Sequence, residues 1–84
     1  MNYEYEIRKK AMKFIQKQER SQQIRILRAI YLIPQGDIKK MQGFTNLYRL
    51  RVGDYRILFE MNQKTDTITL ITITDADSRG QIYK

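Results

Sequence analysis

Three arginines in two adjacent segments are the residues of this chain best suited to chemistry. Arg49 and Arg51 belong to a run rich in β-branched and aromatic residues, Arg56 belongs to the next such run, and only Gly53-Asp54 separates the two. A two-residue loop that begins with Gly is typical of a tight β-hairpin. In that register Arg51 faces Arg56 directly, and Arg49 faces Leu58 and lies two residues along on the same side.

This side of the predicted hairpin, called the arginine face below, points away from the core. The alternating residues Tyr48, Leu50 and Val52 are apolar and are expected to pack under the helices, and Glu60 is the single carboxylate expected near the arginines. Opposed like charges destabilise a strand pair, whereas guanidinium groups bind phosphate oxygens well. The spacing therefore predicts an anion-binding surface. The alternative is a solvated basic face that only keeps the sheet soluble.

Other cations and a tyrosine extend the candidate site. Arg79, Tyr83 and Lys84 follow the last predicted strand, where a terminal segment can return beside the central strands. A tyrosine between cations suits base stacking, although an aromatic residue there can also cover the edge of the core. Lys39 and Lys40 form a second basic pair, for which a solvated loop is the simpler interpretation.

The composition removes several classes of enzyme. The chain has 84 residues, a net charge of +7, a pI near 9.9, no Cys and no His. Catalysis by Cys–His or Ser–His–Asp groups and a thiolate zinc site are excluded, and no metal or cofactor is expected. The excess of positive charge favours a polyanionic partner. No segment is apolar and long enough to span a membrane or resembles a signal peptide, so a cytoplasmic location is expected.

The periodicity of the sequence predicts the elements that position these residues. A strand is expected over residues 3–7, a basic helix from about Arg8 with Ala11, Phe14 and Ile15 at helical spacing, and a second helix that ends near Leu32. Ser21 is a candidate N-cap of the second helix. The apolar face of this helix is expected to contain Ile24, Leu27, Ile30 and Tyr31 and to pack against the core of the protein.

Three strands are expected after the helices, over residues 47–52, 55–62 and 67–74, whereas residues 38–44 receive no firm structure. The order predicts one α+β domain over residues 1–84. In it, an N-terminal strand and a two-helix hairpin pack on a mainly antiparallel sheet of about four strands.

Three stretches of the sequence carry a family resemblance. They are Lys40-Met41-Gln42-Gly43, the hairpin sequence YRLRVGDYRILF over residues 48–59, and Arg79-Gly80-Gln81-Ile82-Tyr83-Lys84. Together they resemble the RelE/ParE superfamily of bacterial toxins from type II toxin–antitoxin systems, over essentially the whole chain. The hairpin is the most specific part, and the terminal stretch is more similar to the RelE branch.

The resemblance to the RelE branch implies an endoribonuclease that cuts messenger RNA in the ribosomal A site and so inhibits translation. The RNA 2′-hydroxyl attacks the adjacent phosphate and expels the 5′-oxygen, without a metal. The resemblance assigns transition-state stabilisation to Arg56, phosphate contact or protonation of the leaving group to Arg79, and base stacking or proton acceptance to Tyr83. Substrate binding falls to Arg49, Arg51, Lys39, Lys40 and Lys84.

This chain departs from the family at several of these positions. RelE proteins commonly have lysines where Arg49 and Arg51 stand, and a guanidinium does not accept a proton. Asp75 and Asp77 stand where the family usually has an extra cation or a small residue. The general base is therefore not assigned.

The resemblance also implies partners. It implies a small acidic RelB-like antitoxin encoded beside the toxin, contacts with messenger RNA and with 16S and 23S ribosomal RNA, and operator DNA bound only through the antitoxin. Two other functions are consistent with the sequence. One is a ParE-like inhibitor of DNA gyrase, and the other is a basic nucleic-acid-binding domain without catalysis.

Overall fold

The computed structural model describes residues 2–78, which form two helices and a five-stranded sheet. In chain order the elements are β1 (Asn2–Ile7), α1 (Lys9–Gln16), α2 (Arg20–Tyr31), β2 (Asp37–Lys40), β3 (Leu47–Val52), β4 (Tyr55–Gln63) and β5 (Ile68–Ser78). The strand order across the sheet is β1-β5-β4-β3-β2. All neighbouring strands are antiparallel except β1 and β5, which are parallel. The α+β class predicted from the sequence is confirmed.

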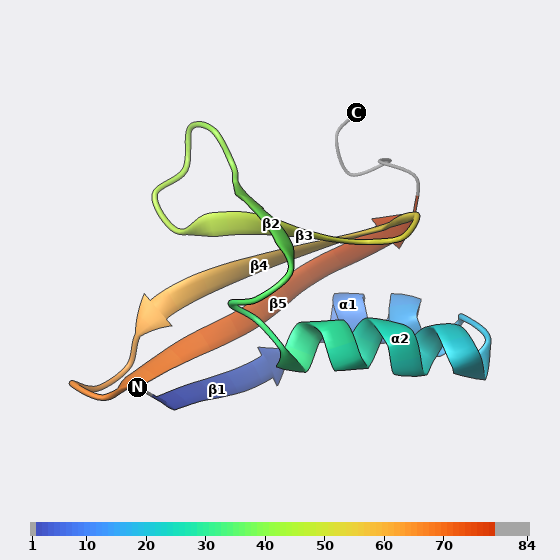
Figure 1. The fold of residues 1–84 in the computed structure, drawn as a ribbon, viewed down its shortest axis with the longest axis horizontal. Coiled ribbons are helices and arrows are strands. Elements are labelled where there is room, and N and C mark those ends of the chain that lie inside the picture. Colours follow the sequence, from blue (N-terminus) through green and yellow to red (C-terminus); the bar gives the residue numbers. More distant parts are fainter. Residues whose placement is uncertain (1, 79–84) are drawn as a thin grey trace.

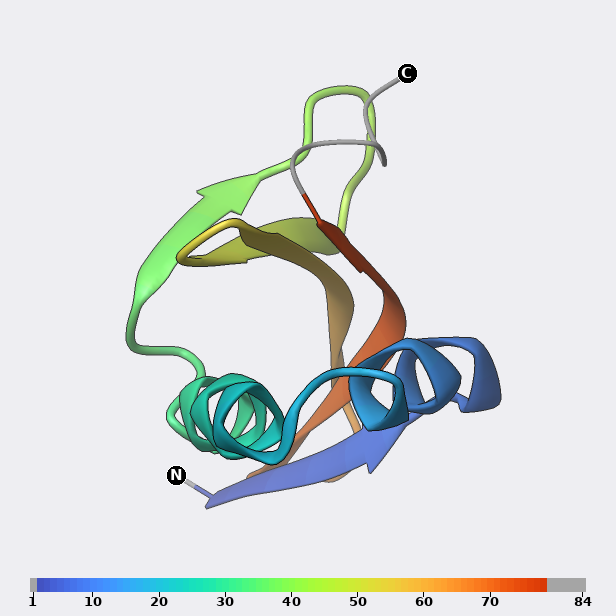
Figure 2. The ribbon, with the colours of Figure 1, turned by 90° about the vertical axis from the view of Figure 1, so that its right-hand side faces the viewer.

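Both helices cover the same face of the sheet, and the sheet curls around them (Figures 1 and 2). The two helices lie side by side and are seen close to end-on in Figure 2. The opposite face of the sheet carries no helix among the described residues. Within residues 2–78, one broad surface of the sheet is thus left free for other contacts.

The core lies between the helices and the sheet. Each helix contributes the residues of one face, and the strands contribute alternate residues, as expected for amphipathic elements. The fully buried large side chains are Ile15, Ile26, Ile30, Ile33, Leu50, Ile57, Phe59, Ile71 and Ile73. Burial of such side chains stabilises the fold by roughly 1.5–3 kcal/mol each.

The fifth strand is β2, which the sequence analysis did not assign. The segment 37–40 is short and mostly charged, and nothing in its periodicity indicates a strand. Their strand conformation comes from pairing with β3, in which Ile38 lies opposite Leu50 and packs against the core. The strand is thus a consequence of tertiary contact.

Two expectations for α2 are wrong. The helix begins at Arg20 with Glu19 at the N-cap position, so Ser21 lies inside the first turn. Its buried residues are Ile26 and Ile30, whereas Ile24 and Tyr31 are 48% and 55% exposed. The other two predicted positions are confirmed, because Ile30 is buried and Leu27 packs against the core.

The strand β5 is longer than expected, because it continues to Ser78. A bulge interrupts its pairing with β4: Leu58 pairs with Asp75 and Phe59 pairs with Ile73, which leaves Thr74 as the extra residue. The Thr74 hydroxyl donates a hydrogen bond to the Leu58 carbonyl at 3.3 Å. Only Ile68–Ile73 pair with β1, so the last residues of β5 have β4 as their single neighbour among the described strands.

Candidate nucleic-acid interface

The β3–β4 hairpin places two guanidinium groups opposite each other. Arg51 pairs with Arg56, and Gly53 adopts φ +58° in the two-residue turn, which confirms the predicted register. The neighbouring pair, Leu50 and Ile57, is buried, so the arginines point to the sheet face without helices. Arg51 is exposed and Arg56 is half-buried, and neither forms an ion pair or side-chain hydrogen bond with residues 2–78. Both are available to an external anion.

Carboxylates flank the arginine pair on both sides, which the sequence analysis missed. Across four strands the register gives the row Asp37, Arg51, Arg56, Asp77, with Asp37 from β2 and Asp77 from β5. The expectation that Glu60 would be the single nearby carboxylate is therefore wrong. The cause lies in the elements: β2 was not assigned, and β5 was expected to stop at residue 74. The surplus of positive charge comes from the next row, which contains two cations, Lys39 and Arg49, and one carboxylate, Asp75.

Arg49 differs from the other two arginines because it has an acidic partner. Its Nη2 lies 3.6 Å from the Asp37 Oδ1, and its side chain is 17% exposed. Its Nε is buried without a hydrogen-bond partner among the described residues, an arrangement that costs free energy. Arg49 is thus held at the β2 side of the arginine face, whereas Arg51 and Arg56 remain unpaired.

The β2–β3 loop forms a shallow pocket of basic and apolar residues beside the arginine face. Lys39 and Lys40 line it together with residues 41–44. By register Lys39 shares a face with Arg49. Lys40 is opposite Tyr48, so its position in the strand belongs to the apolar face. Phe44, which the sequence analysis did not single out, is 57% exposed. Figures 1 and 2 both show this loop beyond β3, on the side away from the helices.

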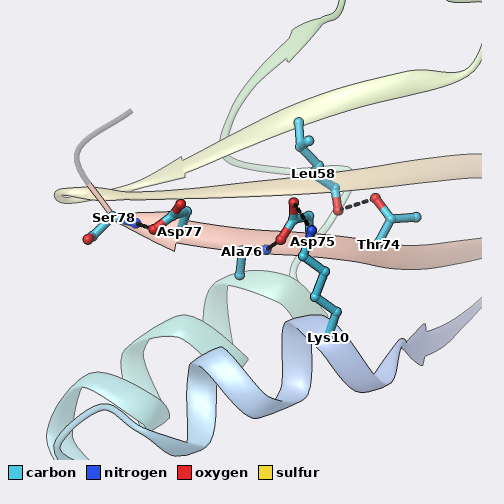
Figure 3. Close-up of polar contacts among 7 residues, drawn as sticks. All are labelled: Lys10, Leu58, Thr74, Asp75, Ala76, Asp77 and Ser78. Carbon is cyan, nitrogen blue, oxygen red and sulfur yellow. Dashed lines mark hydrogen bonds and ion pairs between the residues drawn. The ribbon is translucent and has the colours of Figure 1, made fainter. Parts of the chain in front are cut away.

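The end of β5 carries two carboxylates that are held by their own backbone (Figure 3). The Asp75 Oδ1 accepts a hydrogen bond from the Ala76 N–H at 2.8 Å, and the Asp77 Oδ1 accepts one from the Ser78 N–H at 2.7 Å. Asp75 also pairs with Lys10 of α1, with an Nζ to Oδ2 distance of 3.2 Å. Asp77 forms no such ion pair with the described cations.

The remaining predicted site residues, Arg79, Tyr83 and Lys84, lie outside the described residues. The last described residue, Ser78, pairs with Tyr55, next to Arg56. Within residues 2–78 no cluster of three or more potential metal-ligating side chains is present. The same part of the chain contains no helix that could cross a membrane.

The described site can bind and polarise a phosphate. Arg51 and Arg56 supply positive charge and hydrogen-bond donors, but neither can accept a proton. Carboxylates are the acceptors that the row provides, and Asp77 is the one whose register partner is Arg56. The arrangement therefore combines anion binding with a basic group.

Comparisons with known proteins identify relatives of this chain. No protein-family model matches the sequence. A stretch of 29 residues is 59% identical to Toxin RelE3 of Methanocaldococcus jannaschii, and it covers 34% of this chain and 33% of that protein. The chain thus matches about one third of the length of this curated relative.

Two solved structures match almost the whole chain. One is an archaeal RelE-RelB complex from Pyrococcus horikoshii, with a TM-score of 0.71 and 29% identity over 96% of this chain and 99% of that chain. The other is a RelB-RelE antitoxin-toxin complex from Methanococcus jannaschii, with a TM-score of 0.71 and 30% identity over 93% and 94% of the two chains.

Proposed function

The chain belongs to the RelE family of toxins, and from this premise we propose that it is a ribosome-dependent endoribonuclease. It would cut messenger RNA in the ribosomal A site and so inhibit translation. One observation supports this proposal most directly. Arg51 and Arg56 lie opposite each other, without an acidic ion-pair partner among residues 2–78, on a sheet face that no described helix covers.

The proposed reaction is an internal transesterification of RNA. The 2′-oxygen forms a bond to the adjacent phosphorus as its proton leaves, and the bond from phosphorus to the 5′-oxygen breaks. The products are a 2′,3′-cyclic phosphate and a 5′-hydroxyl. The step needs a proton acceptor, a proton donor and positive charge near the phosphorane oxygens, but no oxidant and no metal.

We assign the charge stabilisation to Arg56 and the positioning of the phosphate to Arg51. Both lie on the uncovered face and keep their donors free of described partners. Arg49, which is paired with Asp37, and Lys39 next to it add positive potential at one end of the row. Arg79, Tyr83 and Lys84 keep the roles that the family implies: leaving-group protonation or phosphate contact for Arg79, base stacking for Tyr83, and substrate binding for Lys84.

The proton acceptor in this proposal is Asp77. Its carboxylate is tied to the Ser78 N–H through Oδ1, and the register places it next to Arg56. Asp75, two residues earlier, is paired with Lys10 and supplies a matched control. Positioning of the RNA by the ribosome then provides much of the rate.

The partner we propose is an acidic RelB-like antitoxin, because the structural relatives are complexes with RelB and this chain carries a net charge of +7. Operator DNA would be bound through the antitoxin. Ribosomal RNA is the further polyanion that the basic loop at Lys39 and Lys40 would contact.

The assignment of Arg56 is tested with Arg56→Gln on programmed ribosomes that have an open A site. Loss of one donor that stabilises developing charge lowers the cleavage rate by roughly 100-fold or more. The matched control is Lys64→Gln, which removes one positive charge from an exposed pair with Glu4, at the turn that leads into β5. The readout is the single-turnover rate, with cut sites located by mapping 5′ ends.

Three results would contradict the proposal. Full activity of Arg56→Gln would overturn the site assignment, and equal cutting of naked RNA would overturn ribosome dependence. Inhibition of gyrase by the wild-type chain, without cleavage of RNA, would identify a ParE-like inhibitor instead.

The role of Asp77 is tested by Asp77→Asn against Asp75→Asn. Loss of a general base lowers the rate by about 100-fold, so we expect that loss for Asp77→Asn and a change of less than a few-fold for Asp75→Asn. Equal rates in the two variants would remove Asp77 from the mechanism.

A further inference from the structure

The loop between β2 and β3 presents the most exposed large hydrophobic side chain among residues 2–78. Phe44 is 57% exposed, and its ring forms no pair with another aromatic ring in the described part of the chain. A single exposed apolar residue is common and indicates nothing by itself. The anchoring of the loop, the charges around the ring and the position of the loop on the sheet together indicate a binding element.

The ends of the loop are held by hydrogen bonds. The Met41 N–H donates to the Leu47 carbonyl at 2.9 Å, and the Met61 N–H donates to the Asn46 carbonyl at 3.2 Å. The side-chain amide of Asn46 also donates to the Asn62 Oδ1 at 2.7 Å. Two of these three contacts join the loop to β4. A loop that is already ordered loses less conformational entropy when a ligand binds.

The surroundings of the ring are basic. Residues 38–46 contain two cations, Lys39 and Lys40, and no carboxylate. Both lysines are exposed, and neither forms an ion pair with another described residue. They line the shallow pocket of the loop together with Phe44 and the exposed amide of Gln42. An aromatic ring beside unpaired lysines suits single-stranded RNA, because the ring stacks on a base while the cations bind the phosphates.

The pocket of the loop continues the arginine face. Lys39 lies opposite Arg49, and Arg49 lies two residues from Arg51 along β3. At about 3.3 Å per residue, the first residue of β3, Leu47, is roughly 13 Å from Arg51. Stacked nucleotides rise about 3.4 Å each, so this distance corresponds to a few nucleotides. Figures 1 and 2 show the loop beyond β3, on the side away from the helices, to which the arginines also point.

We propose that Phe44 stacks on an unpaired base of the messenger RNA, a few nucleotides from the phosphate at Arg51 and Arg56, while Lys39 and Lys40 bind the neighbouring phosphates. This inference rests on the proposed function, which places a messenger on the arginine face. A stacked base holds the strand at one end, so that the phosphate to be cut stays at Arg56. Phe44 is therefore a positioning residue and takes no part in proton transfer.

The first measurement is affinity for ribosomes programmed with a messenger that carries a 2′-deoxy nucleotide at the cut site, which removes the attacking hydroxyl. We expect Phe44→Ala to bind at least about fivefold more weakly than the wild type, because it loses one stacked base. Phe44→Leu should also bind more weakly, since it keeps an apolar side chain but no ring, and Phe44→Trp should bind as well as the wild type. The matched control is Leu32→Ala, which removes an apolar side chain of similar exposure, 55%, and should stay within twofold.

The second measurement uses tryptophan fluorescence, because the chain contains no Trp. The emission of Phe44→Trp should change when a short single-stranded RNA is added. An oligomer of abasic sugar phosphates of the same length should leave the emission unchanged, since it has charge but no base. Leu32→Trp carries the same fluorophore outside the loop and should respond to neither probe.

Several results would contradict the proposal. Full affinity of Phe44→Ala or Phe44→Leu would overturn the stacking contact, and both variants should unfold thermally like the wild type because the side chain is exposed. An emission change of Phe44→Trp on ribosomes without a messenger would identify ribosomal RNA as the ligand instead. A change with an acidic protein partner but not with RNA would identify a protein contact. A wild-type chain that shows these effects with free RNA but cuts no messenger would overturn only the proposed function.

Discussion

The side chain of Tyr5 joins three parts of the molecule. Its ring contacts Tyr31 of α2, and its hydroxyl donates a hydrogen bond of 2.6 Å to the carbonyl of Ile33, which is buried. The pKa of Tyr5 is raised above its usual value because burial disfavours the phenolate, and Tyr3 adds to the effect. The contact therefore requires the neutral phenol.

We expect Tyr5→Phe to lower the free energy of unfolding by about 1–2 kcal/mol, since a buried carbonyl loses its donor. The pKa of Tyr5 is higher in the folded protein than its value of 10.0 in the unfolded chain. The stabilisation that the neutral phenol provides is therefore complete below pH 10.0 and is lost as the pH rises through the pKa of the folded protein. Urea unfolding at pH 7 and at steps up to pH 11 measures both effects.

Tyr3→Phe is the comparison for this prediction. The difference in the free energy of unfolding between the wild type and Tyr5→Phe should narrow above pH 10, the pKa of Tyr5 in the unfolded chain. A constant gap over the whole range would show that the hydroxyl does not act through its protonation.

The pairing of Arg51 with Arg56 could be predicted from single residues, because a two-residue turn fixes the register of every position that follows it. The positions of the carboxylates Asp37 and Asp77 beside these arginines could not be predicted in this way. Each is brought to the row by an element whose existence or length depends on its neighbour in the sheet. Local sequence carries little information about such neighbours.

At the scale of elements, the β3–β4 turn controls the arginine face. Gly53 has φ +58°, a region that most side chains avoid, and a Cβ added there would lie 2.7 Å from the Nη2 of Arg25. The guanidinium of α2 thus packs directly on the turn of the hairpin. This contact is one link between the helical layer and the sheet.

Gly53→Ala should destabilise the protein by about 1–2 kcal/mol, most of it from the positive φ. The arginine is the end of a flexible side chain and can move aside, so Gly53→Ala in an Arg25→Ala background should cost nearly as much. Gly53→Asn should cost less, because Asn tolerates this region. Chemical denaturation of the four variants separates the two causes, and a cost that vanishes in the Arg25→Ala background would assign it to the clash.

The elements also show where sequence reasoning succeeds. The hairpin, the order of the elements other than β2 along the chain and the core face of α1, with Ala11 and Ile15, follow from local patterns. In α2 the apolar residues extend beyond one face, and periodicity alone cannot tell which of them meet the sheet. The choice of Ile26 and Ile30 is made by the position of α2 against β3.

At the scale of the whole molecule, the surplus of positive charge is distributed unevenly. The two helices and the turn between them carry seven cations over residues 9–31, whereas the row with Arg51 and Arg56 also contains two carboxylates. Affinity for RNA at the arginine face should therefore depend on a few specific contacts more than on the net charge.

The number of phosphate contacts can be read from the salt dependence of binding to a short single-stranded RNA. Arg51→Gln should reduce the slope of log K against log salt by about 0.7, the value for one contact to a single strand. Lys64→Gln, in its pair with Glu4, should leave the slope unchanged. Binding over a salt series, measured by fluorescence anisotropy, distinguishes the two. Equal slopes in the wild type and Arg51→Gln would remove this residue from the phosphate contacts.

The parallel pairing of β1 with β5 has a consequence for how the protein is made. Asn2 lies beside Ile68, and β5 lies between β1 and β4. Until β5 has been synthesised, β1 therefore has no neighbour that joins it to the rest of the sheet. A nascent chain that ends before residue 68 leaves β1 without its partner and the Arg51–Arg56 couple without Asp77. The row across the sheet is thus completed only after Asp77 has been added, and a chain stalled before that point cannot assemble it.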